Sequence, residues 1–436
     1  MEKNVEINYE SKENNVIYVD KLNYEIQNLE KIYIKEHYNI NQIENNNIEK
    51  ILEKIRLYKK DNNILIDNIF WKSLHKISAK PGGFISIKNR KEIYSFILDT
   101  LSKRAEYKIF STPVTKEQIT SYDTIIKNDC KRSVLYSIIR SNDQFRKYQI
   151  NKNIEESNNM NSIENSIIDE NDENKKTIKI YINELMDFTK ESLGNYEYFN
   201  YFQGYQEVCL YFMIIFGRKE GVKYMTLFAK IYLEYVLSKK YKINFDMLLD
   251  ILNNCCNTVN KKANMLINKI TKTKPYYSLS WLITYLTHSN DNIFNQLTLL
   301  DYFITSNISH IYFLSANIIV SEFNKIGTKF NIQSADEEYT YMELFFQHFQ
   351  KLKISLIDFE KIIKENEKIN HKLFNTIIFY MMKNIKNEND KGTLVLINRN
   401  IYNNQIFEYH SVKHKLFYFF IVAIIFIIII YKRFLN

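Results

Sequence analysis

The chain has 436 residues, a formal net charge of +9 at pH 7 and a composition that is 45% hydrophobic and 15% aromatic. Its 8 glycines and 3 prolines are too few for the many turns of a β-sandwich or a β-propeller, so an all-α fold with two or three lobes is expected. The positive charge is dispersed along the chain and forms no basic stripe with interleaved aromatics, so no nucleic acid is expected as a partner.

The N-terminal residues 1–42 are polar and lack sustained periodicity, and we interpret them as a poorly ordered arm without a secretory signal peptide. A first amphipathic helix is predicted from Ile48, where apolar residues begin to recur at helical spacing, and a second over 64–78. The sequence Pro81-Gly82-Gly83 then interrupts the chain. A folded domain is therefore expected to begin near residue 43.

Residues 151–176 form a low-complexity segment with too little apolar content to be buried, and we predict a disordered surface insertion there. The apolar run from Val208 to Phe216 indicates a central buried helix. Later helices are predicted over 254–272, 279–288, 293–305, 308–325, 338–350, 356–367 and 370–386. The cysteines lack CxxC spacing and are expected to be reduced, buried thiols, namely Cys130, Cys209, Cys255 and Cys256.

Residues 416–431 are uninterrupted apolar sequence with basic residues on both sides, preceded by a polar tether over 387–415. As a helix this segment would span about 24 Å, and flanking Lys and Arg side chains can reach the bilayer surface from that depth. We predict a C-terminal transmembrane tail anchor with the preceding residues in the cytosol. The alternative is a buried C-terminal core helix, which would need complete burial because it has no polar face.

The first of two short motifs runs from Ile126 to Arg132. If the segment is a helix, Ile126, Cys130 and Val134 form one buried stripe, and Arg132 lies about 200° from Cys130 and points away from it. Asp129 precedes Arg132 by three residues, where its carboxylate could hold the guanidinium in place. The ordinary alternative is an exposed helical ion pair.

The second motif runs from Tyr201 to Glu207. Gly204 lies where a long helix is predicted to begin, so it permits close approach of another backbone and places the Gln203 amide at the helix entrance. The alternative is a loop glycine beside a polar residue that satisfies backbone groups. An arginine can spread positive charge over a transferring phosphoryl group, and a glutamine amide can orient the attacking water.

The two motifs in order, IxxDxxR and YxQGxxE, resemble the signature of the TBC-domain GTPase-activating proteins for Rab GTPases. Residues 69–74 are similar to the family's opening tryptophan motif, and Trp281 with residues 300–303 resembles its second-lobe motif. The likeness covers about residues 48–350. Residues 201–205, residues 278–288 and the tail anchor are most similar to the endoplasmic-reticulum branch, which acts on the Rab of early secretory traffic.

The resemblance implies an all-α, two-lobed TBC domain over 43–350, further helices over 351–386 and a C-terminal transmembrane helix. Arg132 and Gln203 are implied as the catalytic arginine and glutamine fingers, supplied to a GTP-bound Rab. The residues implied to support the fingers or contact the partner are Asp129, Tyr201, Gly204 and Glu207. GTP and Mg²⁺ would be bound by the partner, so the chain would have no cofactor of its own. The implied location is the endoplasmic reticulum membrane, with the Golgi and mitochondrial outer membranes as alternatives.

The chain departs from the family at Asp67, where the family has an arginine, and at Glu207, where it has an aspartate. Arg132 and Gln203 are also 71 positions apart (203 minus 132), and the extra length coincides with the predicted insertion. The chain has no GxxxxGK[ST], HExxH or nucleophile-elbow motif, so no hydrolase site of its own is expected. The rival interpretations are a catalytically inactive TBC-fold membrane scaffold and a Rab-binding effector.

Overall fold

The structure is a computed structural model that describes residues 23–24, 26–31, 33, 42–61, 68–104, 122–134, 172–194, 201–237, 245–287, 292–327, 335–352 and 356–371. All regular elements within these ranges are helices, and no strand occurs among them, which confirms the all-α expectation for this part of the chain. None of these helices is long and apolar enough to cross a lipid bilayer. The predicted tether and the apolar segment 416–431 lie outside the described residues.

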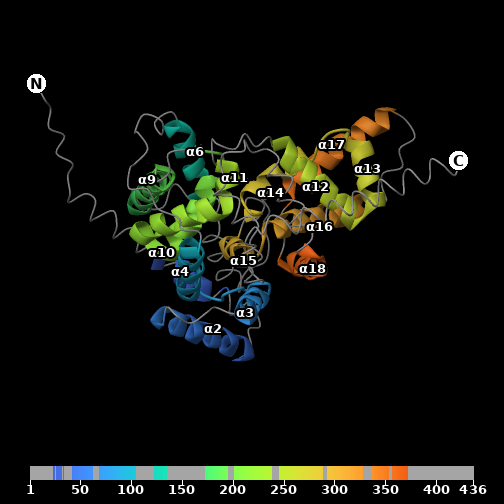
Figure 1. Ribbon diagram of the computed structural model, residues 1–436. Coiled ribbons are helices and arrows are strands. Elements are labelled where there is room, and N and C mark those ends of the chain that lie inside the picture. Colours follow the sequence, from blue (N-terminus) through green and yellow to red (C-terminus); the bar gives the residue numbers. More distant parts are fainter. Residues whose placement is uncertain are drawn as a thin grey trace, which may run out of the picture.

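The first half of the chain is built around one buried helix. Its helices are α2 (Gln42–Lys60), α3 (Asn68–Ser78), α4 (Ile87–Arg104), α6 (Asp123–Ser133), α9 (Asp172–Gly194) and α10 (Tyr205–Phe228). Helix α10 contacts α4, α6 and α9, so it is covered on several sides (Figure 1). The predicted central run over 208–216 is buried throughout, because each of its faces meets another helix.

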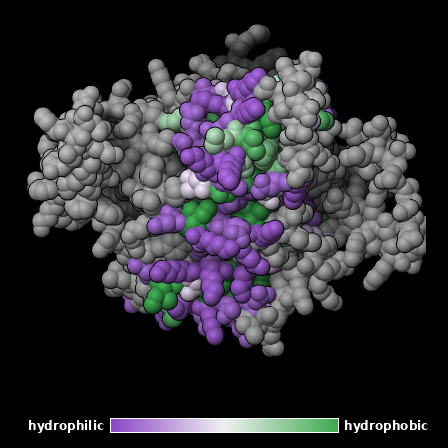
Figure 2. Space-filling model, turned by 90° about the vertical axis from the view of Figure 1, so that its right-hand side faces the viewer, coloured by the Kyte–Doolittle hydropathy of each residue, from purple (hydrophilic) through white to green (hydrophobic). Residues whose placement is uncertain are grey.

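The second half is a separate set of packed helices on the other side of the molecule (Figure 1). A short π-helix (Ala229–Leu233) and α11 (Glu234–Leu237) follow α10 directly. The next elements are α12 (Phe245–Val259), α13 (Lys261–Thr271), a 3₁₀ helix (Tyr276–Ser278) and α14 (Leu279–Ile283). The last described helices are α15 (Ile293–Ile304), α16 (Ile308–Gly327), α17 (Ala335–Lys351) and α18 (Leu356–Asn366). Helix α16 contacts α12, α13, α14 and α18. On this side of the molecule, the described residues present mainly hydrophilic groups with smaller hydrophobic patches (Figure 2).

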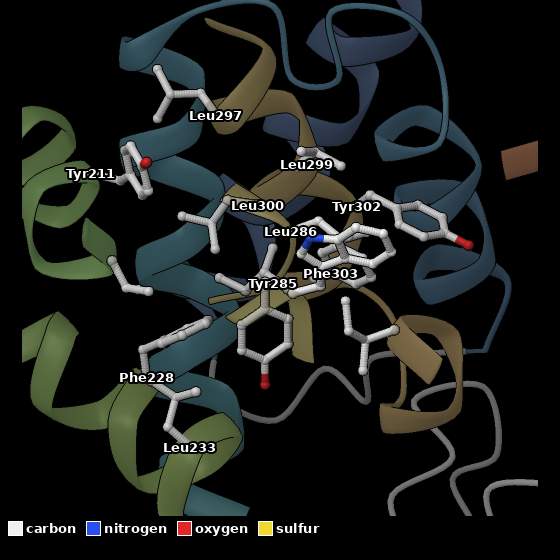
Figure 3. Packing of buried hydrophobic residues seen from close by; sticks show 14 of the residues in the cluster. Tyr211, Phe228, Leu233, Tyr285, Leu286, Leu297, Leu299, Leu300, Tyr302 and Phe303 are labelled. Atoms are coloured by element: carbon white, nitrogen blue, oxygen red, sulfur yellow. The ribbon is translucent and has the colours of Figure 1, made fainter. Parts of the chain in front are cut away.

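Helix α15 joins the two sets, because it contacts α3 and α4 of the first half. Leu297, Leu300 and Tyr302 on it are fully buried. Figure 3 shows Leu300 on the same side of α15 as Tyr211 and Phe228, while Tyr302 points the other way. Every residue of α15 except Asn295 is buried, which places this helix at the centre of the molecule.

A buried ionic cluster fixes α15 against α4. Arg90 donates from Nε to Asp301 at 3.0 Å and also pairs with Glu30, and all three side chains are at most 3% exposed. Asp301 further accepts from the Phe84 backbone N–H at 2.9 Å and from the Tyr94 hydroxyl at 2.8 Å. The cluster therefore satisfies most of its polar atoms internally, as buried charges require.

Part of the predicted N-terminal arm is packed into the fold. Residues 23–24, 26–31 and 33 are helical, and Ile26 and Tyr33 are buried. Asn23 donates to the backbone carbonyl of Met213 at 3.1 Å, and Tyr33 donates to Asn295 at 2.9 Å. The expectation of poor order failed here because widely spaced apolar residues among polar ones gave no clear period, although each contacts the core.

Helix boundaries also differ from the predictions. Helix α9 begins at Asp172, inside the predicted insertion over 151–176, whose other residues lie mostly outside the described ranges. The predicted helix over 254–272 divides at Asn260, whose side chain accepts from the Ala263 N–H at 3.0 Å and so caps a new helix, α13. The predicted helix over 279–288 ends early, because Tyr285 and Leu286 have φ of 54° and 62°.

The predicted state of the cysteines is confirmed. All four are free and buried. Burial in apolar surroundings raises the pKa of the Cys209 and Cys256 thiols to about 12, so both stay protonated and unreactive at neutral pH.

Candidate functional site

Helix α6 has the predicted orientation. Ile126, Cys130 and Val134 are fully buried along one side, while the Arg132 side chain is 55% exposed on the other. Ile125 is also exposed, at 49%, and precedes Arg132 by seven residues, which places both on the same face of the helix. The exposed face of α6 therefore combines a cation with an apolar side chain.

The buried Asp129 side chain holds the exposed Arg132 side chain in place. Its carboxylate is only 1% exposed and accepts a hydrogen bond from Nη2 of Arg132, three residues later in the same helix. The pair restricts the guanidinium, which is otherwise free to rotate in solvent. The predicted role of Asp129 as the anchor of Arg132 agrees with this contact.

Residues 201–204 form a tight turn into α10. The Tyr205 N–H donates to the Phe202 carbonyl at 3.2 Å, and the Glu207 N–H donates to the Gly204 carbonyl at 3.0 Å, while the Gln203 side chain is exposed. Gly204 has φ of 109°, and a Cβ atom at this position would lie 2.5 Å from Cγ2 of Thr284. Only glycine fits there, so the turn that presents Gln203 depends on Gly204.

A buried network of hydrogen bonds joins the turn to α6. The Tyr201 hydroxyl lies 2.6 Å from Oδ2 of Asp129 and 2.7 Å from Oε1 of Gln206. The same Gln206 oxygen accepts from the Gly204 N–H at 2.9 Å, and its Nε2 donates to Oγ of Ser133 at 3.3 Å. Burial, followed by the hydrogen bond to Asp129, raises the pKa of Tyr201 far above its ordinary value, so the hydroxyl keeps its proton.

The network brings the two sequence motifs to one place in the structure. Arg132 projects into solvent at one end of it, and the turn that carries Gln203 lies at the other, although 71 positions separate the two residues in the chain. The Tyr201 hydroxyl contacts Asp129 on α6 and Gln206 on α10, and Glu207 is half-buried in the first turn of α10. Arg132 and Gln203 are thus a cation and a carboxamide on exposed segments held by the same buried groups.

Gln206 is a member of this site that neither sequence motif singles out. It is 3% exposed and contacts both Tyr201 and the Gly204 N–H. A glutamine in the first turn of a helix, two residues after a glycine, can accept from an unsatisfied N–H at the helix start, and this signal was available in the sequence.

The tryptophans and the aspartate of the other two family-like motifs lie inside the fold. Trp71, Trp281 and Asp301 are at most 2% exposed and belong to the core or to the ionic cluster. Asp67, at the departure from the family pattern, lies outside the described residues. Trp71, Trp281 and Asp301 therefore hold the fold that supports the site and do not reach its surface.

The chemistry available at the site is electrostatic. It offers a fixed guanidinium and an exposed amide, but the carboxylate and hydroxyl beneath them are already paired with each other. Such groups can stabilise negative charge and orient water on a bound partner. Comparison with protein-family models finds no match to this chain. Comparison with curated proteins also finds none.

Proposed function

We propose that this protein is a TBC-type GTPase-activating protein that accelerates GTP hydrolysis by a Rab GTPase. The observation that supports it best is the buried Asp129–Tyr201–Gln206 network, which connects the exposed Arg132 to the turn bearing Gln203. Two fingers that act on one phosphate need such a common support, because misplacement by about 1 Å can cost about 100-fold in rate.

In this proposal the helices around α10 and those around α16 are the two lobes of a TBC domain, and the GTP-bound Rab docks over α6 and the 201–204 turn. Ile125 would contact an apolar side chain of the Rab beside the catalytic groups. Residues 416–431 would anchor the protein in the endoplasmic reticulum membrane. GTP and Mg²⁺ belong to the Rab, and the chain contributes side chains only.

The two fingers have different tasks. Arg132 would neutralise the charge that develops on the β- and γ-phosphate oxygens, and Gln203 would position the attacking water. An arginine finger typically contributes roughly 10³ to 10⁵ in rate, which is about 4 to 7 kcal/mol of activation free energy. Removing either side chain should therefore abolish most of the activation without changing the fold, since both side chains are exposed.

The test measures phosphate release from a panel of GTP-loaded Rabs with fragment 1–412, which keeps every described residue, including those within 23–33 that pack into the core. We expect Arg132→Ala and Gln203→Ala to lose at least about 100-fold in kcat/KM on the Rab that responds. Lys131→Ala, an exposed cation beside Arg132, and Gln347→Ala, an exposed glutamine on α17, are matched controls and should keep full activity.

Two outcomes would contradict the proposal. If no Rab responds to the wild-type fragment but some are captured only in their GTP state, the protein is an effector and not an activator. If a Rab responds but the two finger variants match Lys131→Ala and Gln347→Ala, the activity resides elsewhere in the chain.

A further inference from the structure

Two histidines and a glutamate converge far from the proposed catalytic site, where α3, α16 and the end of α18 meet. One ligand atom from each of His75, His310 and Glu367 lies within 4.8 Å of the others. The two histidine side chains are 7% and 3% exposed, while the Glu367 side chain is 36% exposed. The group is therefore buried on the imidazole side and reaches solvent on the carboxylate side.

The hydrogen bonds around His310 fix which of its nitrogens carries a proton. Oδ1 of Asn307 accepts from the Ser309 backbone N–H at 3.2 Å, so this atom is an oxygen and an acceptor. Nδ1 of His310 lies 2.9 Å from the same oxygen and must donate to it. In the neutral ring the lone pair is then on Nε2, which lies 3.7 Å from Oε1 of Glu367.

The surroundings of His75 favour the same arrangement. Its Nδ1 lies 3.1 Å from Oγ1 of Thr305, and that hydroxyl lies 2.9 Å from the Tyr302 carbonyl, to which it can donate while it accepts from Nδ1–H. Nε2 of His75 then faces the two Glu367 oxygens at 3.1 and 3.2 Å. Two nitrogen lone pairs and a carboxylate that face one another repel, and either a proton on one of the nitrogens or a metal cation between the three groups removes that repulsion.

We propose that His75, His310 and Glu367 bind a divalent transition-metal ion of the zinc class. Imidazole nitrogens with one carboxylate suit Zn²⁺ and its neighbours Co²⁺ and Ni²⁺, and the absence of thiolate from the triad disfavours Cu⁺. Zinc ligands at about 2.0 to 2.2 Å in a tetrahedron lie roughly 3.3 Å apart. Oε1 of Glu367 lies 3.2 Å from Nε2 of His75 and 3.7 Å from Nε2 of His310, and both separations are close to that value.

The neighbouring side chains hold the ligands in place, as outer-shell partners of metal sites do. The Tyr302 hydroxyl donates to Oε1 of Glu367 at 2.6 Å. His371 stacks on His310, with ring centroids 3.6 Å apart and planes 11° apart. His371 is not itself a ligand, because its Nε2 lies 2.7 Å from the Asn366 carbonyl and its Nδ1 lies 2.9 Å from Oγ of Ser309.

The ion would join the end of α18 to α3 and α16. Glu367 directly follows α18, whereas His75 and His310 come from helices in the two halves of the chain. With three protein ligands, the fourth position would be filled by water on the exposed side of Glu367. The role assigned to the site is structural: it fastens α18 to the core.

The test uses the full-length chain without a histidine tag, purified in detergent, stripped with EDTA and titrated with Zn²⁺ and with Co²⁺ under reducing conditions. The wild type should bind one tight equivalent, with the visible absorption of tetrahedral Co²⁺. In Glu367→Gln this affinity should fall at least about 100-fold, since losing only an outer-shell partner already costs about 10- to 100-fold. The amide can still accept from Tyr302, so this variant should fold.

Two matched controls should bind like the wild type. Glu365→Gln alters a glutamate two residues away that pairs with Lys368, and His348→Gln alters a histidine that pairs with Glu322. Zn²⁺ should also slow hydrogen exchange in peptides covering 356–371 of the wild type and both controls, but not of Glu367→Gln. The proposal is overturned if the wild type binds no tight equivalent, or if Glu367→Gln binds it as tightly as Glu365→Gln does.

Discussion

The Tyr201 hydroxyl is the centre of the proposed catalytic support. It has one proton and lies within hydrogen-bond distance of both the Asp129 carboxylate and the Gln206 amide oxygen. A charged acceptor binds a proton more strongly than a neutral one, so the hydroxyl donates to Asp129. That bond fixes the carboxylate that in turn orients Arg132.

Tyr201→Phe should therefore weaken catalysis more than binding. Asp129 would lose a donor and hold Arg132 less firmly, so we expect kcat for Rab GTP hydrolysis to fall about 10-fold with KM nearly unchanged. Leaving the buried Asp129 carboxylate with one donor fewer should also cost about 1 to 3 kcal/mol of stability. Steady-state kinetics and thermal unfolding of fragment 1–412 measure both effects.

Tyr276→Phe is the matched control, because it also removes a hydroxyl that donates to a carboxylate, Asp246, but on an exposed surface away from α6. It should leave kcat unchanged. A Tyr201→Phe variant with wild-type kcat would show that the network does not position Arg132.

Gly204 shows what the sequence could and could not reveal at this scale. The position of a glycine before a long helix predicted the close approach of another backbone, and the resemblance assigned that approach to the partner. The structure instead places Thr284 of the same chain against it. A contact between residues 80 positions apart (284 minus 204) depends on tertiary packing, which no local pattern contains.

At the scale of elements, apolar periodicity predicted α15, α16, α17 and α18 to within a few residues of their bounds. It failed where a single side chain decides the outcome, as at the Asn260 cap, or where the backbone takes positive φ, as at Tyr285. It also gave no indication that Glu30 and Arg90 meet Asp301, because those three residues lie on separate segments. Long-range polar contacts of this kind follow from the fold and cannot be predicted from a local sequence pattern.

The ionic cluster on α4 and α15 should make stability depend on pH. Two buried carboxylates share one guanidinium, and burial raises the pKa of Glu30 above its ordinary value of 4.5. The folded protein then binds this proton more tightly than the unfolded chain does. The contribution of Glu30 to stability is complete below pH 4.5 and is lost as the pH rises through the folded-state pKa.

Glu30→Gln removes that dependence, because its amide stays neutral. Relative to the wild type, the variant should gain stability as the pH rises above 4.5, by up to about 1.4 kcal/mol for each pH unit between the two pKa values. Urea unfolding of fragment 1–412 over a pH series measures the difference. Glu92→Gln, which alters a surface partner of Arg56, is the control and should follow the wild-type slope. If the free energy of unfolding changes with pH in the same way for Glu30→Gln and the wild type, then Glu30 is ionised in the folded protein without a loss of stability.

At the scale of the whole molecule, the N-terminal residues within 23–33 bridge helices that belong to both halves. Asn23 contacts Met213 of α10 and the Tyr181 hydroxyl of α9, and Tyr33 stacks on Phe294 of α15 with ring centroids 4.9 Å apart. The segment thus reaches from the α9–α10 pair to α15. A TBC-like domain that started at residue 43 would lack this bridge.

A fragment 42–412 should accordingly be less stable than a fragment 22–412, which keeps every described residue. The shorter fragment loses the burial of Ile26 and Tyr33, worth about 1.5 to 3 kcal/mol for each large apolar side chain, and leaves the Ile87 N–H without the Glu30 carboxylate that accepts from it at 2.7 Å. We expect a lower thermal midpoint and faster hydrogen exchange in α4, α10 and α15, with α12 and α16 little affected. A synthetic peptide of residues 20–41 added in trans should restore the slow exchange, because Ile26 and Tyr33 can again be buried against the remaining helices. Equal thermal midpoints for the two fragments would show that the residues within 23–33 contact the other helices but do not stabilise the fold.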